Sequence, residues 1–386
     1  MSVFKNKKLL IKSLLLFILM NIALYSFLQF FHSAILFKKS QYLISGYHYI
    51  QDPRMKNKPF NLVSALAPYD AQWYLHNAVE GYLKNPKVLE EKMSYNFFPF
   101  LTFSIKFFYL FIPNIELAAF VLSNTLLLLN FFSLYYVITK WYSEKLAIKT
   151  IFLLFLFPFS IFFRSYYTEM LKLFFFIWFS YFLINKRFFW AATCLSLINI
   201  TNGIVLILNP IFYWYLIQAV MQKKEYWAKA VIAICISFIP LIAWCIFCYL
   251  HTGDFFYFYK TRFWWWRPQI PIVWNIQQIF LFPWLHPFGM YSTKTDVLAV
   301  VLSGIILIKS RKLLHPTLWV VTCGLWIMPL LVQDTISFSR LQIVLFPLFL
   351  FLAHSLQKKY YFAVLAFFTI LLGIYSLFFV NWYWIE

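Results

Sequence analysis

The chain has 386 residues, of which 63% are hydrophobic and only 12% are charged. A soluble domain of this length could not keep so much apolar surface from water, so the composition excludes an ordinary soluble protein. The net charge of +20 is divided among short clusters instead of forming one basic face, which argues against a nucleic-acid partner. We therefore expect a single all-α membrane domain over residues 1–386.

Apolar runs of about 18 residues or more recur along the chain, and each is long enough to cross a hydrocarbon core of about 30 Å. Six basic clusters separate them, and the positive-inside rule places these clusters in the cytoplasm. The pattern predicts about eleven transmembrane helices, with the N-terminus inside and the C-terminus outside. The predicted spans are 9–34, 116–139, 147–165, 169–185, 188–202, 203–220, 229–250, 295–309, 316–333, 338–356 and 360–381.

Two long segments, 38–115 and 251–294, are then expected on the outer side. The first includes a short apolar stretch, 97–112, which we expect to form an interfacial or re-entrant helix. The second is rich in tryptophan, which favours the headgroup level. Most acidic residues also fall on the outer side, and only Glu144 and Glu225 are expected inside. This asymmetry suggests a polar working site on the outer face.

The first candidate site lies near the start of the outer segment. Asp70, Trp73, Asn77 and Gly81 recur at helical spacing, and Tyr74 follows the tryptophan. Carboxylates bind sugar hydroxyls, and one carboxylate can accept the proton of an attacking hydroxyl. The alternative is an amphipathic surface helix in which the acid is only an N-terminal cap.

A second candidate, Tyr167 with Glu169, is expected where two spans meet. An ionisable residue at membrane depth is expensive to bury and is therefore a functional candidate. Arg164 and Lys172 are its charged neighbours in sequence. The alternative is a local Arg164–Glu169 ion pair that holds the turn.

A third candidate begins at an acid and continues with cations and an aromatic residue: Asp254, Lys260, Arg262, Trp264 and Arg267. Cations at a membrane surface suit a lipid phosphate, although an aromatic belt with snorkelling cations would look the same. A fourth candidate is Arg340, which opens an apolar run from the outer side. It could hold a phosphate or pair with Asp334.

In chain order, these blocks resemble the PIG-V-like mannosyltransferases, a branch of the GT-C glycosyltransferases. The chain departs from that family at Tyr69, where tryptophan is usual, and at Asn202, where an arginine is frequent. The blocks that carry the resemblance are Asp70, Trp73-Tyr74 and Gly81-Tyr82; Phe97-Phe98-Pro99; Tyr167-Thr168-Glu169; Gly253-Asp254 to Trp264; and Arg340 to Phe346-Pro347.

The resemblance implies a GT-C-like fold and an inverting glycosyltransferase. Such an enzyme moves a sugar, typically mannose, from a polyprenyl- or dolichyl-phosphate donor to a hydroxyl of a glycan or glycolipid at the outer or luminal face. Asp70 would be the general base, and Glu169 and Asp254 would share its cavity. Cations would stabilise the leaving lipid phosphate. The membrane would be a bacterial inner membrane or the endoplasmic reticulum.

Two other functions stay open at this point. A transporter or flippase for a lipid-linked glycan would also be polytopic, but it would place polar groups near the middle of the membrane. A non-catalytic subunit of a glycosylation complex is the third alternative, which Asn202 keeps open. The sequence contains no Gly-rich phosphate loop or HExxH motif, so no cofactor is expected, and a divalent metal held by the three acids remains an alternative.

Overall fold

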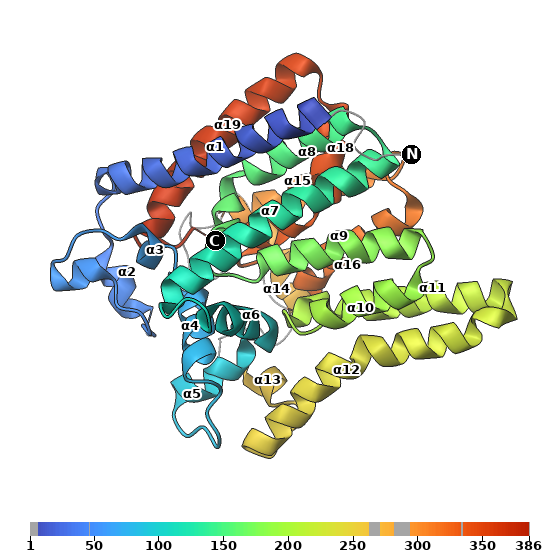
Figure 1. Ribbon diagram of the computed structural model, residues 1–386, viewed down its shortest axis with the longest axis horizontal. Helices are drawn as coiled ribbons and strands as arrows, with labels where there is room; N and C mark the ends of the chain where they lie inside the picture. The colour runs from blue at the N-terminus through green and yellow to red at the C-terminus, as the bar shows by residue number, and fades with distance from the viewer. Residues whose placement is uncertain (1–6, 46, 262–270, 282–293, 333–334, 386) are drawn as a thin grey trace. The chain divides into compact units, whose positions relative to one another are not determined.

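The computed structural model describes residues 7–45, 47–261, 271–281, 294–332 and 335–385, and within those ranges every regular element is a helix (Figure 1). The α-helices are α1 (Lys7–Phe31), α2 (Lys39–Ile44), α3 (Leu62–Ala65), α4 (Asp70–Val79), α5 (Leu89–Met93), α6 (Pro99–Tyr109), α7 (Ile115–Trp141), α8 (Glu144–Phe155), α9 (Glu169–Ile184), α10 (Phe188–Ile198), α11 (Leu208–Gln222), α12 (Trp227–Thr252), α13 (Tyr257–Lys260), α14 (Pro271–Leu281), α15 (Lys294–Ser310), α16 (Pro316–Val332), α17 (Phe338–Leu341), α18 (Phe346–Ser355) and α19 (Lys358–Val380). Short 3-10 helices include η4 (Pro158–Phe163), η5 (Gly203–Ile207), η6 (Lys224–Tyr226) and η8 (Gln342–Val344).

Five helices among the described residues are long and apolar enough to cross a membrane: Lys7–Ala34, Ile115–Trp141, Gly203–Gln222, Trp227–Thr252 and Lys358–Val380. They coincide with five of the spans expected from sequence. A sixth expected span, 338–356, is a helix pair bent by 78° between Val344 and Phe346. These long apolar helices fit a membrane-embedded, all-helical protein.

The other five expected spans correspond to helices of 11 to 17 residues. A helix needs about 20 residues to cross the hydrocarbon core without tilt or thinning. One interruption has a clear local cause, because Pro158 follows α8 and starts the 3-10 helix η4. The total of about eleven spans therefore stays a prediction.

The helix ends follow ordinary capping rules. The Asn114 side chain accepts a hydrogen bond from the Leu117 amide at the start of α7, 2.9 Å away, and Ser143 caps α8 through the Leu146 amide. At the other end of α12, Gly253 adopts a left-handed conformation with φ of 76°. Only glycine takes that conformation at no steric cost, so it stops the helix one residue before Asp254.

The chain divides into two compact units, and each is described by itself below. Unit 1 comprises Met1–His76, Ile105–Met170 and Phe349–Ile385. Unit 2 comprises Asn77–Ser104 and Leu171–Leu348. Asp70 and Glu169 thus belong to unit 1, whereas Asp254 and Arg340 belong to unit 2.

Unit 1 is built on α1, α7, α8 and α19, with η4 packed against α19. Its core is aromatic: the Phe17 ring lies 5.0 Å from the rings of both Phe131 and Phe155. In unit 2, α10 packs along α12 (Figure 1). A second aromatic core there joins the buried side chains of Tyr82, Tyr95, Phe98, Trp244 and Cys248.

Candidate functional site

Asp70 is the first residue of α4, and its side chain is half-buried. The preceding residue, Tyr69, has φ of 52°, in the left-handed region that non-glycine residues rarely adopt. This sharp reversal ends the segment before α4 and places the carboxylate in the first turn of the helix. A negative charge there is stabilised by the helix dipole. Residues 67–70 are called the Asp70 turn below.

Hydrogen bonds from side chains hold the Asp70 turn at successive residues. The Gln72 amide donates to the Ala67 carbonyl (2.5 Å) and accepts from the Ile50 backbone amide (2.7 Å). The Tyr167 hydroxyl donates to the Pro68 carbonyl, 3.0 Å away. Because Gln72 and Tyr167 are both buried, these bonds form away from water and are costly to lose. The Pro68 carbonyl also accepts a longer hydrogen bond from the Ala71 backbone amide, at 3.3 Å.

The third bond connects the turn to the end of α19. The Tyr69 hydroxyl donates to the Trp382 carbonyl at 2.9 Å. The Tyr69 ring also packs edge-on against the rings of Trp382 and Trp384, with centroids 5.3 and 4.9 Å apart. Trp382 is itself in the left-handed region, with φ of 64°. The strained residue before Asp70 is therefore fixed by a second strained residue, 313 positions later.

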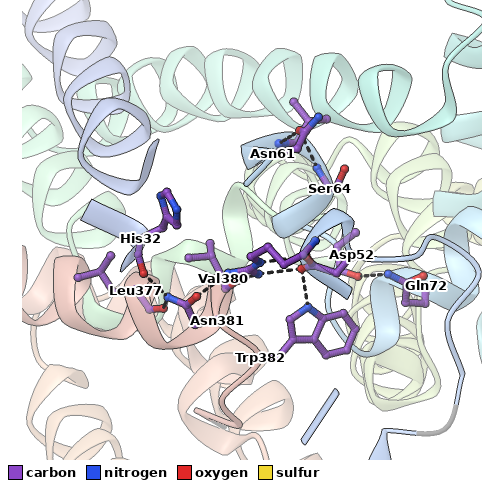
Figure 2. A network of polar contacts seen from close by, with 12 residues as sticks. His32, Asp52, Asn61, Ser64, Gln72, Leu377, Val380, Asn381 and Trp382 are labelled. Atoms are coloured by element: carbon purple, nitrogen blue, oxygen red, sulfur yellow. Dashed lines mark hydrogen bonds and ion pairs between the residues drawn. The ribbon is translucent and has the colours of Figure 1, made fainter. Parts of the chain in front are cut away.

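Figure 2 shows the polar network that fixes Trp382 in turn. Arg54 binds Asp52 bidentately, at 2.9 Å from Nε and 2.7 Å from Nη2, and it donates to the Asn381 side chain and the Val380 carbonyl. The Trp382 indole donates to the same Asp52 carboxylate at 3.3 Å. Asp52 is only 4% exposed, so this ion pair is buried. It joins the segment before α3 to the end of α19.

Trp73 and Tyr74, which we expected to bind substrate, are buried. The Trp73 ring stacks on Tyr47, with centroids 4.0 Å apart and planes 15° apart. Asn77 belongs to unit 2, where its amide donates to the Ser94 carbonyl at 3.2 Å. These three residues pack α4 against its surroundings, and their binding roles stay predictions.

Glu169 is the first residue of α9 and is 1% exposed. The segment before it is tied to the rest of unit 1 by Tyr166 and Tyr167, whose hydroxyls donate to the carbonyls of Val63 and Pro68. Pro68 lies two residues before Asp70, and Tyr167 lies two residues before Glu169. One hydrogen bond therefore links the turns that carry two of the expected catalytic acids, 99 residues apart.

Arg164 is fully buried beneath this segment. Its guanidinium donates to the Asn21 side chain on α1 at 2.8 Å, to the carbonyl and hydroxyl of Ser160, and to the Phe155 carbonyl. All of these acceptors are neutral. Arg164 therefore anchors the segment before Glu169 to α1 and to η4, which differs from the local Arg164–Glu169 pair that the sequence left open.

In unit 2, Asp254 lies in a turn at the surface. One carboxylate oxygen accepts from the Phe256 amide at 2.9 Å, and the other pairs with the Lys260 ammonium. The hydrogen bond from Lys260 holds the pKa of the Asp254 carboxyl below its ordinary value. Both partners are reached within six residues of chain. Arg262, Trp264 and Arg267, the rest of this candidate, lie outside the described residues.

Arg340 lies on α17 and is half-buried. Ser337, the residue before α17, has φ of 63°, and the Ser339 amide donates to the Asp296 carboxylate at 2.9 Å. Asp296, at the start of α15, is fully buried. Asp296 thus fixes the turn that carries Arg340. Asp334, the other partner considered for Arg340, lies outside the described residues.

The structure adds residues that the sequence did not single out: Gln72, Trp382, Asp52, Arg54 and Asp296. Each of them also contacts a residue more than 20 positions away in sequence, so spacing along the chain gives no sign of these contacts. Of these residues, only Asp296 could have been recognised from the sequence, because it is one of few acids at the end of a predicted helix. Within the ranges that the structure describes, no three His, Cys, Asp or Glu side chains are grouped so that they could hold a metal ion.

Comparison of the chain with protein-family models, with functionally characterised proteins and with solved structures found no significant match. The residues themselves and the geometry of the Asp70 turn are therefore the basis for inferring function.

Proposed function

We propose that the protein is an inverting glycosyltransferase of the GT-C type, which moves a sugar from a polyprenyl- or dolichyl-phosphate donor to a hydroxyl of a glycan or glycolipid acceptor. The sugar is mannose in the family that the sequence resembles. The observation that carries the proposal is the hydrogen bond from Tyr167 to the Pro68 carbonyl. It joins two blocks of that resemblance at the turns that carry Asp70 and Glu169.

Asp70 is the general base in this proposal. Transfer with inversion needs one carboxylate that removes the acceptor proton while the hydroxyl oxygen attacks the anomeric carbon. The bond from that carbon to the lipid phosphate breaks, and the phosphate leaves with the negative charge. The base must be held in place, because a misplaced reacting group costs much of the rate. This role for Asp70 is supported by side-chain hydrogen bonds to the carbonyls of residues 67 and 68 and by the bond that the Tyr69 hydroxyl donates to the Trp382 carbonyl.

Glu169 is a second acid near the acceptor in this proposal, and Arg340 is the cation for the lipid phosphate. Arg340 suits that task because a guanidinium binds phosphate bidentately. Asp254 acts mainly through Lys260, whose charge it balances. The lipid donor would reach the site sideways from the bilayer, which explains why a soluble nucleotide-binding domain is not needed.

The proposed arrangement in the membrane follows the charge pattern of the chain. About eleven spans cross the bilayer, the N-terminus is cytoplasmic, and the Asp70 turn lies on the outer or luminal side. The membrane would be a bacterial inner membrane, or the endoplasmic reticulum in a eukaryote. Cysteine labelling with a membrane-impermeant reagent, in a cysteine-free background, tests this. Labelling from outside at residue 311, with protection at residue 70, would overturn the orientation.

The activity itself is tested with purified protein in proteoliposomes that contain radiolabelled polyprenyl-phosphate-mannose and a crude glycolipid acceptor fraction. We expect label to move from the donor to the acceptor. Asp70→Asn should lower turnover by roughly 100-fold or more while donor binding stays nearly intact. Glu80→Gln, which changes an exposed acid just after the same helix, is the matched control and should stay close to wild type. Full activity in Asp70→Asn would show that Asp70 is not the general base.

A further inference from the structure

A cavity of about 540 Å³ opens in unit 2, far along the chain from the Asp70 turn. It lies where the turn between α9 and α10 meets η6 and the beginning of α12. Its lining residues are Lys186, Arg187, Phe188, Phe189, Trp190, Tyr226, Lys229 and Ile232. This volume is within the range of cavities that hold small molecules.

One part of the lining is cationic. Lys186, Arg187 and Lys229 come from two segments that lie about 40 residues apart in sequence, and the side chains of all three are exposed. Lys186 has φ of 54°, so the turn that presents Lys186 and Arg187 is a tight reversal, whereas Lys229 lies in the first turn of α12. The Lys229 ammonium lies 5.4 Å from the centre of the Tyr226 ring. None of the eight lining residues is acidic, so the cavity favours an anionic ligand.

The other part of the lining is apolar and open. Phe188 is buried and forms the inner wall, whereas Phe189, Trp190 and Ile232 are 53%, 54% and 53% exposed. These exposed side chains lie on α10 and α12, which pack along each other. A free phosphate or another small, wholly polar anion would use the cations and leave this apolar part uncovered. An amphipathic anion would use both parts.

We propose that this cavity binds the headgroup of an anionic phospholipid, with the phosphate between Lys186, Arg187 and Lys229 and the acyl chains along Trp190 and Ile232. Arginine can bind phosphate oxygens bidentately, and each cation near an anionic membrane surface contributes measurable affinity. Tryptophan favours the level of the headgroups. Both basic segments are among those predicted to face the cytoplasm, where anionic lipids attract basic residues.

The positive-inside rule alone does not account for this cavity. The positive-inside rule needs only positive charge near the ends of spans. It needs neither a cavity, nor arginine in preference to lysine, nor an aromatic wall. The proposal is also independent of the glycosyl-transfer activity, because it concerns a different part of the chain and its test requires no turnover.

The test measures lipid binding to the purified full-length protein by native mass spectrometry and by thermal stabilisation. The probes are phosphatidylglycerol and phosphatidylcholine with identical acyl chains, with glycerol 1-phosphate and inorganic phosphate as soluble competitors. We expect phosphatidylglycerol to bind and stabilise preferentially, and each cation replaced by glutamine to weaken its binding about fivefold. Because the protein is purified first, its orientation in the cell does not influence the result.

Matched variants distinguish specific lipid binding in this cavity from nonspecific attraction of the lipid to basic residues. Lys358→Gln with Lys359→Gln removes two cations from the start of α19, and this control should keep the phosphatidylglycerol preference. Arg187→Lys keeps the charge but should weaken binding, and Trp190→Ala should weaken phosphatidylglycerol without creating a response to glycerol 1-phosphate. Equal binding of the two lipids, an equal loss in the control, or full competition by a soluble phosphate would each overturn the proposal.

Discussion

Two acids of the candidate site, Asp70 and Asp254, are held in very different ways. The turn before Asp70 is fixed by side chains or backbone from residues 72, 167 and 382. Asp254 is fixed by the Phe256 amide and the Lys260 ammonium, within its own loop. Mostly buried contacts, two of them long-range, define the Asp70 turn, whereas short-range, exposed contacts define the turn at Asp254.

This difference indicates which of the two carboxylates is better placed to act as a general base. A buried network resists movement, because its hydrogen bonds form away from water and are costly to break. An exposed pair between neighbours in sequence is screened by solvent and contributes little. A pre-organised carboxylate is what general-base catalysis requires. The contrast therefore favours Asp70 as the base and gives Asp254 the task of balancing Lys260.

The largest expected effect comes from the ion pair that supports the Asp70 turn through Trp382. Arg54→Gln leaves the Asp52 carboxylate buried without its cation, so we expect the free energy of unfolding to fall by about 3–5 kcal/mol. Thermal denaturation of the purified protein measures this. Arg311→Gln, which removes an exposed arginine, should cost less than about 1 kcal/mol. Similar losses in the two variants would mean that the network does not stabilise the protein.

The next prediction separates the positioning of Asp70 from the stability of the folded protein. Tyr167→Phe removes the hydroxyl that donates to the Pro68 carbonyl, and Tyr166→Phe removes the one that donates to the Val63 carbonyl. Each variant should lose about 1–3 kcal/mol of stability. Only Tyr167→Phe should also lower turnover, by roughly tenfold, because of these two tyrosines Tyr167 alone bonds to the Asp70 turn. Equal turnover in the two variants would show that this bond has no part in positioning Asp70.

A smaller effect is expected at the proposed phosphate cation. Arg340→Gln should raise the KM for the lipid donor by roughly tenfold, and Arg340→Lys should recover only part of it if the contact is bidentate. Lys312→Gln, at an exposed basic cluster, should leave the donor KM unchanged. Unchanged donor dependence in both Arg340 variants would exclude this arginine from the donor site.

The smallest effect concerns the Asp254–Lys260 pair. Because the folded-state pKa of Asp254 lies below its ordinary value, the pair stabilises the protein above the ordinary carboxyl pKa of about 4 and loses this contribution as the pH falls through the lowered pKa. We expect Asp254→Asn to cost less than about 1 kcal/mol at pH 7. The difference from wild type should shrink in thermal denaturation as the pH falls below about 4, and a difference that grows toward lower pH would contradict the sign.

Sequence reasoning predicted the helical membrane class and five long spans, because an apolar run of sufficient length leaves few other structures possible. It did not predict that 338–356 bends by 78°, although the proline at 347 in this span could have suggested a break. It also singled out Asp70, Tyr167 and Glu169, since polar residues among apolar spans are conspicuous. The hydrogen bond from Tyr167 to the Pro68 carbonyl links the turns that carry the two acids, and the roles of these residues stay predictions.

The supports of the site could not be predicted in the same way. Trp382 acts through its carbonyl oxygen, and Gln72 and Tyr167 bind backbone carbonyls, so none of these contacts requires a recognisable pair of side chains. Asp52 and Arg54 form a local pair that looks like an ordinary surface loop in sequence. Their burial depends on the end of α19, more than 320 residues later.

The most direct test of the central claim compares the turnover of Asp70→Asn with that of Asp254→Asn, using the same donor, acceptor and proteoliposomes. The two substitutions are chemically identical, and each keeps the size of the side chain while removing its basicity. We predict that Asp70→Asn loses roughly 100-fold or more in turnover and that Asp254→Asn keeps most of it. Equal losses, or a larger loss in Asp254→Asn, would contradict the assignment of Asp70 as the base.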